Sequence, residues 1–121
     1  MGELRVLVVD DDRRNACLLG RMLREDGFQI EVLFDGAAAV GRLAREPLPD
    51  VLIADVKMAH VDGIAVAQFA RSRRPDVKIV FLTGYPNLVK THCLDPKPLV
   101  YTKPLNYSSL RGALELVRVH R

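Results

Sequence analysis

Three short apolar runs, each followed at once by a polar residue, constrain the fold of this chain more than any other feature. They occupy residues 4–9, 51–54 and 77–82. The runs are rich in branched side chains and do not alternate with polar residues, which is typical of strands covered on both faces of a parallel sheet. Residues 28–34 do alternate and predict a strand nearer the sheet edge, and residues 99–102 predict a short last strand.

Apolar residues at helical spacing fill the intervals between these strands. They predict helices over residues 15–25, 36–45, 64–73 and 108–119. Glycine or proline closes the first three, at Gly27, Pro47 and Pro75, and Ser108 or Ser109 is expected to cap the last. The alternation of strands and helices requires right-handed crossovers. We therefore predict a doubly wound α/β fold, with a parallel sheet and helices on both faces.

One interval departs from this regular pattern. Between Thr83 and Lys103 a fourth helix should fit, but prolines bound the segment 86–98 and interrupt it at Pro96. Only residues 87–93 could be helical. We expect a short or irregular element there.

Length and composition indicate one soluble domain over residues 1–121, with 49% apolar residues to form its core. No apolar run approaches the roughly 20 residues that span a bilayer, and no secretory signal is evident, so we expect a cytoplasmic protein without membrane contact. The two cysteines, Cys17 and Cys93, are predicted to be small buried side chains in a reducing compartment. The mild net charge of +3 and the arginines at 71, 73 and 74 favour a solvated helix face over a nucleic-acid patch.

Polar residues gather where the predicted strands end. They are Asp10 and Asp11, Asp55, Thr83 and Lys103. The carboxyl ends of parallel strands share one edge of a sheet, so these side chains should converge there. Carboxylates that converge either have raised pKa values or attract a cation such as Mg²⁺. Each residue alone has a local explanation, as a helix cap, a turn residue or a solvated lysine, but the agreement of four strand ends is hard to attribute to chance.

Four motifs carry a resemblance over the length of the chain. They are Val-Leu-Val-Val-Asp-Asp-Asp at 6–12, Asp-Val-Leu-Ile-Ala-Asp-Val-Lys-Met at 50–58 with Asp-Gly at 62–63, Phe-Leu-Thr-Gly at 81–84, and Lys-Pro-Leu at 103–105. In this order they resemble the receiver domain of bacterial response regulators. The segment Leu-Asp-Pro at 94–96 is similar to receivers in or near hybrid histidine kinases. The resemblance implies a flavodoxin-like sheet of five parallel strands in the order 2-1-3-4-5.

The resemblance also implies roles at a metal site. Asp55 resembles the residue that accepts the phosphoryl group. Asp11 resembles the direct metal ligand, and Asp10 its partner that often reaches the metal through water. The backbone carbonyl of Lys57 matches a further ligand, and the cofactor would be Mg²⁺ or Mn²⁺.

Further roles concern the phosphoryl group and the switch. Thr83 and Lys103 match the residues that contact phosphoryl oxygens, and the bond before Pro104 is usually cis in the family. Lys57 and Tyr85 match positions that tune hydrolysis of the acyl phosphate, and Gly84, directly before Tyr85, is expected to modulate the site as well. Ala59 stands where the family usually has proline. Val100 stands at the position where the family has an aromatic residue that takes part in the switch. Tyr101, one residue later, should point to the other face of its strand.

These features together predict a phospho-accepting receiver in two-component signalling, which takes the group from a histidine kinase or histidine phosphotransfer protein. It would change a protein-interaction surface, with an unidentified target and a possible weak homodimer, and would not be a turnover enzyme. A phosphatase of the haloacid dehalogenase type is disfavoured, because Lys57 occupies the place of its second aspartate. Direct nucleic-acid binding is disfavoured because no recognition-helix pair follows the last predicted helix. An adaptor that works without phosphorylation stays open, given Ala59 and Val100.

Overall fold

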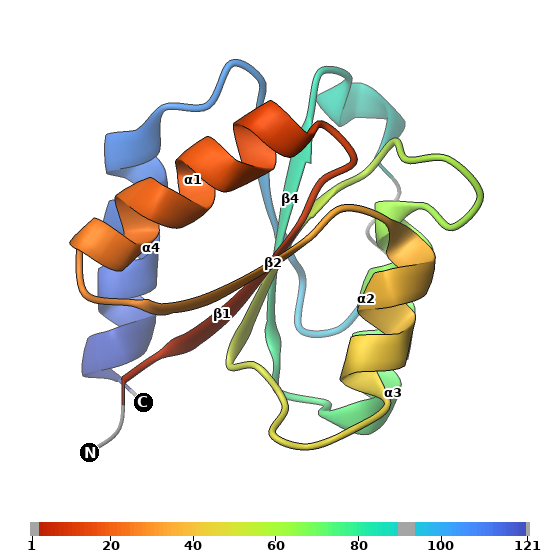
Figure 1. Cartoon of the computed structure of the whole chain (residues 1–121), viewed down its shortest axis with the longest axis horizontal. Coiled ribbons are helices and arrows are strands. Elements are labelled where there is room, and N and C mark those ends of the chain that lie inside the picture. The colour runs from red at the N-terminus through yellow and green to blue at the C-terminus, as the bar shows by residue number, and fades with distance from the viewer. Residues whose placement is uncertain (1–2, 90–93, 121) are drawn as a thin grey trace.

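A computed structural model describes residues 3–89 and 94–120 of the chain. It contains a sheet of five parallel strands in the order β2-β1-β3-β4-β5 (Figure 1). The strands are β1 (Arg5–Val9), β2 (Gln29–Leu33), β3 (Val51–Asp55), β4 (Lys78–Thr83) and β5 (Leu99–Thr102). The predicted α/β class and strand order are confirmed.

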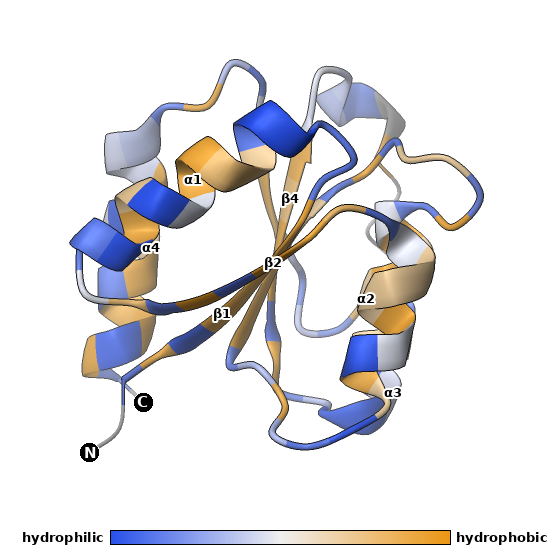
Figure 2. Ribbon diagram, in the orientation of Figure 1, coloured by the Kyte–Doolittle hydropathy of each residue, from blue (hydrophilic) through white to orange (hydrophobic). Residues whose placement is uncertain are grey.

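Two pairs of helices cover the two faces of the sheet (Figure 1). α1 (Arg13–Glu25) and α4 (Tyr107–Val119) pack on one face, and α2 (Gly36–Leu43) and α3 (Gly63–Arg73) pack on the other. Alternate residues of the central strands enter the two cores, so that Val8 lies under α1 whereas Val9 lies under α2. Figure 2 shows the largely hydrophobic strands between helices that carry both hydrophilic and hydrophobic residues.

Side chains at the loops start the helices. Asp12, Asp35 and Asp62 each accept a hydrogen bond from the backbone N–H three residues later, which satisfies a donor of the first turn. The predicted cap of α4 is wrong. Asn106 caps this helix by accepting from the Ser109 N–H at 3.1 Å, so the helix begins before both serines.

Side-chain contacts hold the end of α1 against α4. Gly27, with a φ of +92°, ends α1 as predicted, because a side chain would be strained in that conformation. The Tyr107 hydroxyl donates to Asp26 Oδ2 at 2.6 Å, and the Arg118 guanidinium lies 4.2 Å from the centre of the Phe28 ring. Burial and the Asp26 carboxylate raise the pKa of Tyr107, so it remains a donor at neutral pH.

The short element between β4 and β5 is confirmed. A single 3₁₀ turn spans Pro86–Leu88, and Val89 after it is extended. Residues 90–93, which include most of the possible helix at 87–93, lie outside the described residues. Leu94 is buried against the α2–α3 core, so the described part of this segment covers the sheet without forming an α-helix.

The prediction that Cys17 is buried is wrong. The buried stripe of α1 consists of Ala16, Leu19, Gly20 and Leu23, and Cys17 lies one position beyond it, exposed to solvent. Cys93 lies outside the described residues.

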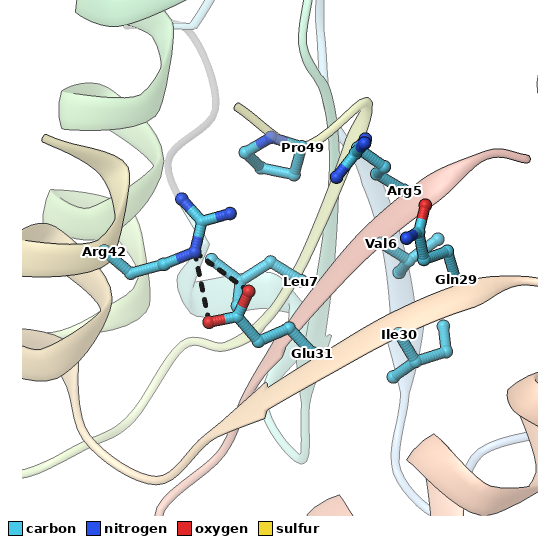
Figure 3. A pocket seen from close by; sticks show the side chains of 8 residues that line it. All are labelled: Arg5, Val6, Leu7, Gln29, Ile30, Glu31, Arg42 and Pro49. Carbon is cyan, nitrogen blue, oxygen red and sulfur yellow. Dashed lines mark hydrogen bonds and ion pairs between the residues drawn. The ribbon is translucent and has the colours of Figure 1, made fainter. Parts of the chain in front are cut away.

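Arg73 is exposed as predicted, whereas Arg71 and Arg74 are half-buried and also bind backbone carbonyls. Arg71 donates to the Val77 carbonyl at 2.8 Å, and Arg74 binds the Asp50 carboxylate at 2.9 Å and the Pro49 carbonyl at 2.9 Å. Figure 3 shows Arg42 paired with Glu31 in the pocket beside β1 and β2. The guanidinium groups satisfy carbonyls of loops at the amino ends of the strands. Within residues 3–89 and 94–120, no helix combines the length and the apolar character needed to cross a membrane.

Candidate functional site

The carboxyl ends of the strands bring the predicted site residues to one edge of the sheet. Val9 of β1 pairs with Ala54 of β3, so that Asp10 and Asp55, each the next residue, lie at the ends of neighbouring strands. The backbone N–H of Lys103, which follows β5, donates to the Thr83 carbonyl at 2.9 Å. Tertiary structure therefore gathers residues that lie up to 93 positions apart in the sequence.

Three carboxylates form the centre of this site. Asp10, Asp11 and Asp55 each place one oxygen within 4.8 Å of the others. Asp10 and Asp55 are buried, with 3% and 7% of their surface exposed, whereas Asp11 is exposed. The cluster thus consists of two buried carboxylates and one exposed carboxylate, so a small ion could reach it from solvent.

The Lys103 side chain reaches the carboxylate cluster from the end of β5. Its Nζ lies 3.2 Å from Asp55 Oδ2 and 3.5 Å from Asp10 Oδ2. Burial alone would lower the pKa of Lys103, but the carboxylates of Asp10 and Asp55 outweigh it and raise the pKa. The ammonium group therefore stays charged across the physiological range.

Asp10 is the carboxylate whose charged form is disfavoured in this arrangement. Burial raises its pKa, and the neighbouring charge of Asp55 adds to the effect. The Asp12 N–H, which donates to Asp10 Oδ1 at 2.9 Å, and the charge of Lys103 compensate only in part. One lysine thus does not neutralise three carboxylates. Oxygen ligands with excess negative charge suit a hard divalent cation such as Mg²⁺, so these residues fit the predicted metal.

Close packing below the site fixes the backbone of Asp55. A Cβ atom on Gly63 would lie 2.1 Å from the Asp55 carbonyl oxygen, so only glycine allows α3 to start this close to β3. The Gly63 N–H also donates to the Val56 carbonyl at 2.9 Å. At its side chain, Asp55 Oδ1 accepts from the Lys57 N–H at 3.3 Å. The sequence indicated a turn at Gly63, but not this contact.

Thr83 presents a hydroxyl beside the carboxylates. The residue is buried, and its Oγ1 accepts a hydrogen bond from the Tyr85 N–H at 2.9 Å. An oxygen that accepts in this way still has its own proton to donate. The hydroxyl can therefore bind an anion at the same edge.

Lys57 and Tyr85 meet across the loops that follow β3 and β4. The Lys57 Nζ lies 5.9 Å from the centre of the Tyr85 ring, within the range of a cation–π contact. Tyr85 and the adjacent Gly84 are exposed, and the space that a Gly84 side chain would enter is open. This pair adjoins the site without entering the carboxylate cluster.

Val100 and Tyr101 point away from each other as predicted. Val100 pairs with Phe81 and is 37% exposed, whereas Tyr101 pairs with Leu82 and packs against the α1–α4 core. The Tyr101 hydroxyl donates to the Ser109 carbonyl at 3.4 Å. Neither side chain contributes a group to the carboxylate site in the described structure, although the peptide bond between Lys103 and Pro104 nearby is cis, as the resemblance implied.

Two neighbouring features had not been predicted. A groove of about 350 Å³ adjoins Asp10 and Lys103, and Leu18 and Met22 of α1 line it with Leu105. In addition, the guanidinium of Arg13 stacks over the Phe34 ring at 4.3 Å. Both depend on contacts between separate elements, for which a single sequence carries no periodic signal.

Comparisons with known proteins agree with this geometry. A family model described as the response regulator receiver domain matches residues 6–115. The transcriptional regulatory protein ZraR of Salmonella typhimurium is 31% identical over 121 residues, a match that covers 98% of this chain and 27% of ZraR. The chain thus spans about a quarter of the length of that relative.

Solved structures show the same likeness. Response regulator TrrA from Thermotoga maritima, in complex with Mg²⁺-BeF, is 27% identical with a TM-score of 0.79, and the match covers 94% of this chain and 98% of TrrA. TrrA in complex with the histidine kinase ThkA gives 27% identity and a TM-score of 0.80, over 94% of this chain and 97% of that one. The receiver domain of the hybrid histidine kinase CckA, at 24% identity, shares the fold with a TM-score of 0.80 over 93% and 97% of the two chains.

Proposed function

The chain belongs to the response regulator receiver domain family, and on that premise we propose that Asp55 accepts a phosphoryl group in two-component signalling. The position of Lys103 is the observation that carries this proposal. Its ammonium lies within 3.5 Å of both Asp10 and Asp55, in a cluster completed by Asp11. A phosphoryl group on Asp55 would meet fixed positive charge on one side and cation ligands on the other.

In the proposed reaction, an oxygen of Asp55 attacks the phosphorus of a phosphohistidine on a partner protein. A P–O bond forms, the P–N bond breaks, and its electron pair leaves with the imidazole. Lys103, held charged by its raised pKa, offsets charge on the phosphoryl oxygens. Mg²⁺ or Mn²⁺ held by Asp10, Asp11, Asp55 and the Lys57 carbonyl would add positive charge at the same oxygens.

Thr83 provides the proposed response to phosphorylation. The acyl phosphate brings roughly −1.5 to −2 charges to a hydroxyl that still has a proton to donate. If Thr83 turns toward it, the bond from the Tyr85 N–H is lost and the segment after β4 is released. With Val100 in place of an aromatic residue, this signal would pass through Tyr85 and the turn Pro86–Leu88.

We place Lys57 and Tyr85 at the water entrance of the site. Their cation–π contact links the loops on both sides of Asp55, and Tyr85 is bulky. Together they would slow attack of water on the acyl phosphate. Such a domain transfers and releases a phosphoryl group once per signal and is not a turnover enzyme.

The proposed partners follow from the chemistry. A histidine kinase or histidine phosphotransfer protein would donate the group, and an unidentified protein would read the changed surface. We place the domain in the cytoplasm, where such kinases present their phosphohistidine, as a single unit that forms at most a weak homodimer. Neither nucleic acid nor membrane is a proposed direct partner.

Labelling by a small phosphodonor tests the proposal. The intact mass of the protein, measured after treatment with acetyl phosphate and Mg²⁺, should increase by one phosphoryl group, and Asp55→Asn should abolish the increase. Asp35→Asn is the matched control, because Asp35 is a carboxylate whose described bond caps α2. Labelling that persists in Asp55→Asn would remove Asp55 from this role.

The same experiment separates the alternative function. An adaptor that signals without phosphate would show no mass increase, and beryllofluoride with Mg²⁺ would leave its amide NMR spectrum unchanged. Exposed Val100, which cannot act as a switch aromatic, is the observation that keeps this alternative. A steady-state assay with small phosphoesters should show no turnover beyond a single labelling event.

A further inference from the structure

Arg13 brings a positive charge to the border of the acidic cluster. It opens α1 immediately after the three aspartates at positions 10–12 and lies two residues beyond Asp11. A cation in the first turn of a helix is unfavourable because the N-terminal end of the helix dipole is already positive. At this place an arginine could also pair with the very carboxylates that a divalent cation needs.

In the structure the Arg13 side chain stacks on an aromatic ring and not on these carboxylates. Its guanidinium lies 4.3 Å from the centre of the Phe34 ring, and Phe34 directly follows β2. The Asp10 N–H donates to the Leu33 carbonyl at 3.2 Å, so the ring is anchored beside the loop that carries the carboxylates. Among residues 3–89 and 94–120, Arg13 has no ion pair with an aspartate, and Asp11 has none with a basic residue.

From this arrangement we propose that Phe34 is a positioning residue that sets the cation affinity of the acidic cluster by holding the Arg13 guanidinium away from Asp11. The inference rests on the proposed cation site. Phe34 itself touches no ion, and its effect acts only through Arg13.

Arg13 stacked on Phe34 and Arg13 paired with a carboxylate are close in free energy. At exposed sites, a cation–π contact and an ion pair have similar strengths. Loss of the ring therefore shifts Arg13 toward the carboxylates, where its charge opposes a divalent cation. The shift should weaken at high salt, because exposed ion pairs are screened while ring stacking is less affected.

Titration of the protein with Mg²⁺ by isothermal calorimetry, without any phosphodonor, tests this inference. Phe34→Leu keeps an apolar side chain but removes the ring, and should weaken Mg²⁺ binding about threefold. Phe34→Tyr keeps the ring and should restore the affinity. Arg13→Gln should bind Mg²⁺ at least as tightly as the original chain, and adding Phe34→Leu to it should cause no further loss.

A distant pair of the same type provides the control. Arg118 stacks over Phe28 at 4.2 Å on the α1–α4 side, and Arg118→Gln should leave Mg²⁺ affinity unchanged. If Phe34→Leu weakens binding equally with and without Arg13, the ring supports the fold only and the inference is wrong. It is also wrong if Phe34→Leu binds as the original chain does.

Asp11→Asn distinguishes this failure from failure of the proposed function. If Asp11→Asn loses Mg²⁺ binding while Phe34→Leu binds Mg²⁺ as the original chain does, the proposed cation site is supported and only the proposed role of Phe34 is wrong. If the original chain binds no Mg²⁺, both fall together.

Discussion

Replacement of Gly63 by alanine tests how tightly the fold holds Asp55. The new Cβ would lie 2.1 Å from the Asp55 carbonyl oxygen and 2.9 Å from its carbonyl carbon, both backbone atoms that cannot rotate away. Ordinary contacts begin near 3.4 Å, so α3 and β3 must separate by more than about 1 Å. Overpacking of this kind costs about 3 kcal/mol.

The higher helix propensity of alanine returns up to about 1 kcal/mol of that cost. We therefore expect the free energy of unfolding to fall by about 2 kcal/mol, a large share of the 5–15 kcal/mol that is typical for a domain. Urea denaturation followed by circular dichroism measures the change. If Asp55 is the phospho-acceptor, its displaced backbone should also slow labelling by acetyl phosphate.

Gly112 provides the matched control for this substitution. It lies inside α4, and a Cβ there would have no heavy atom within 4 Å. Gly112→Ala should therefore stabilise the protein by up to about 1 kcal/mol. A Gly63→Ala variant that unfolds at the same urea concentration as the original chain, or at a higher one, would refute the argument from close packing.

Two further substitutions and one labelling experiment have expected outcomes. Because burial raises the pKa of Asp10, the free energy of unfolding without metal should fall as the pH rises from 3.8 through that raised pKa. In urea denaturation, Asp10→Asn should reduce both this pH-dependent loss of stability and the stability gained on adding Mg²⁺. An Asp10→Asn variant less stable than the original chain at pH 7 without metal would contradict this. Tyr107→Phe should lower the free energy of unfolding by about 1 kcal/mol in urea, since Asp26 loses a donor; an unchanged midpoint would argue against that bond. Maleimide should label exposed Cys17 in the native protein without denaturant, and protection detected by mass spectrometry would show the residue to be covered.

Buried strands could be predicted from the sequence because their requirement is local. A strand covered on both faces needs a continuous apolar run, and the predicted runs agree with β1, β3 and β4 to within one residue at each end. That the polar residues at the strand ends lie close together could be predicted for a related reason. Parallel strands leave all their carboxyl ends at one edge, so the order of elements alone brings Asp10, Asp55 and Lys103 together.

Side chains that depend on a partner from another element were predicted poorly. The cap of α4 at Asn106 and the carbonyl bonds of Arg71 and Arg74 depend on geometry that a periodic pattern does not describe. The exposure of Cys17 depends on a single step of 100° around α1, which composition cannot decide.

The sequence by itself determined which segments are buried and where the polar strand ends meet, because apolar periodicity and chain order act through neighbouring residues. Only the tertiary structure decided that Gly63 touches the backbone of Asp55 and that Arg13 lies over Phe34. Contacts of this kind join residues on different loops, and their distances follow from how helices and strands pack. No local preference of the residues involved contains that information.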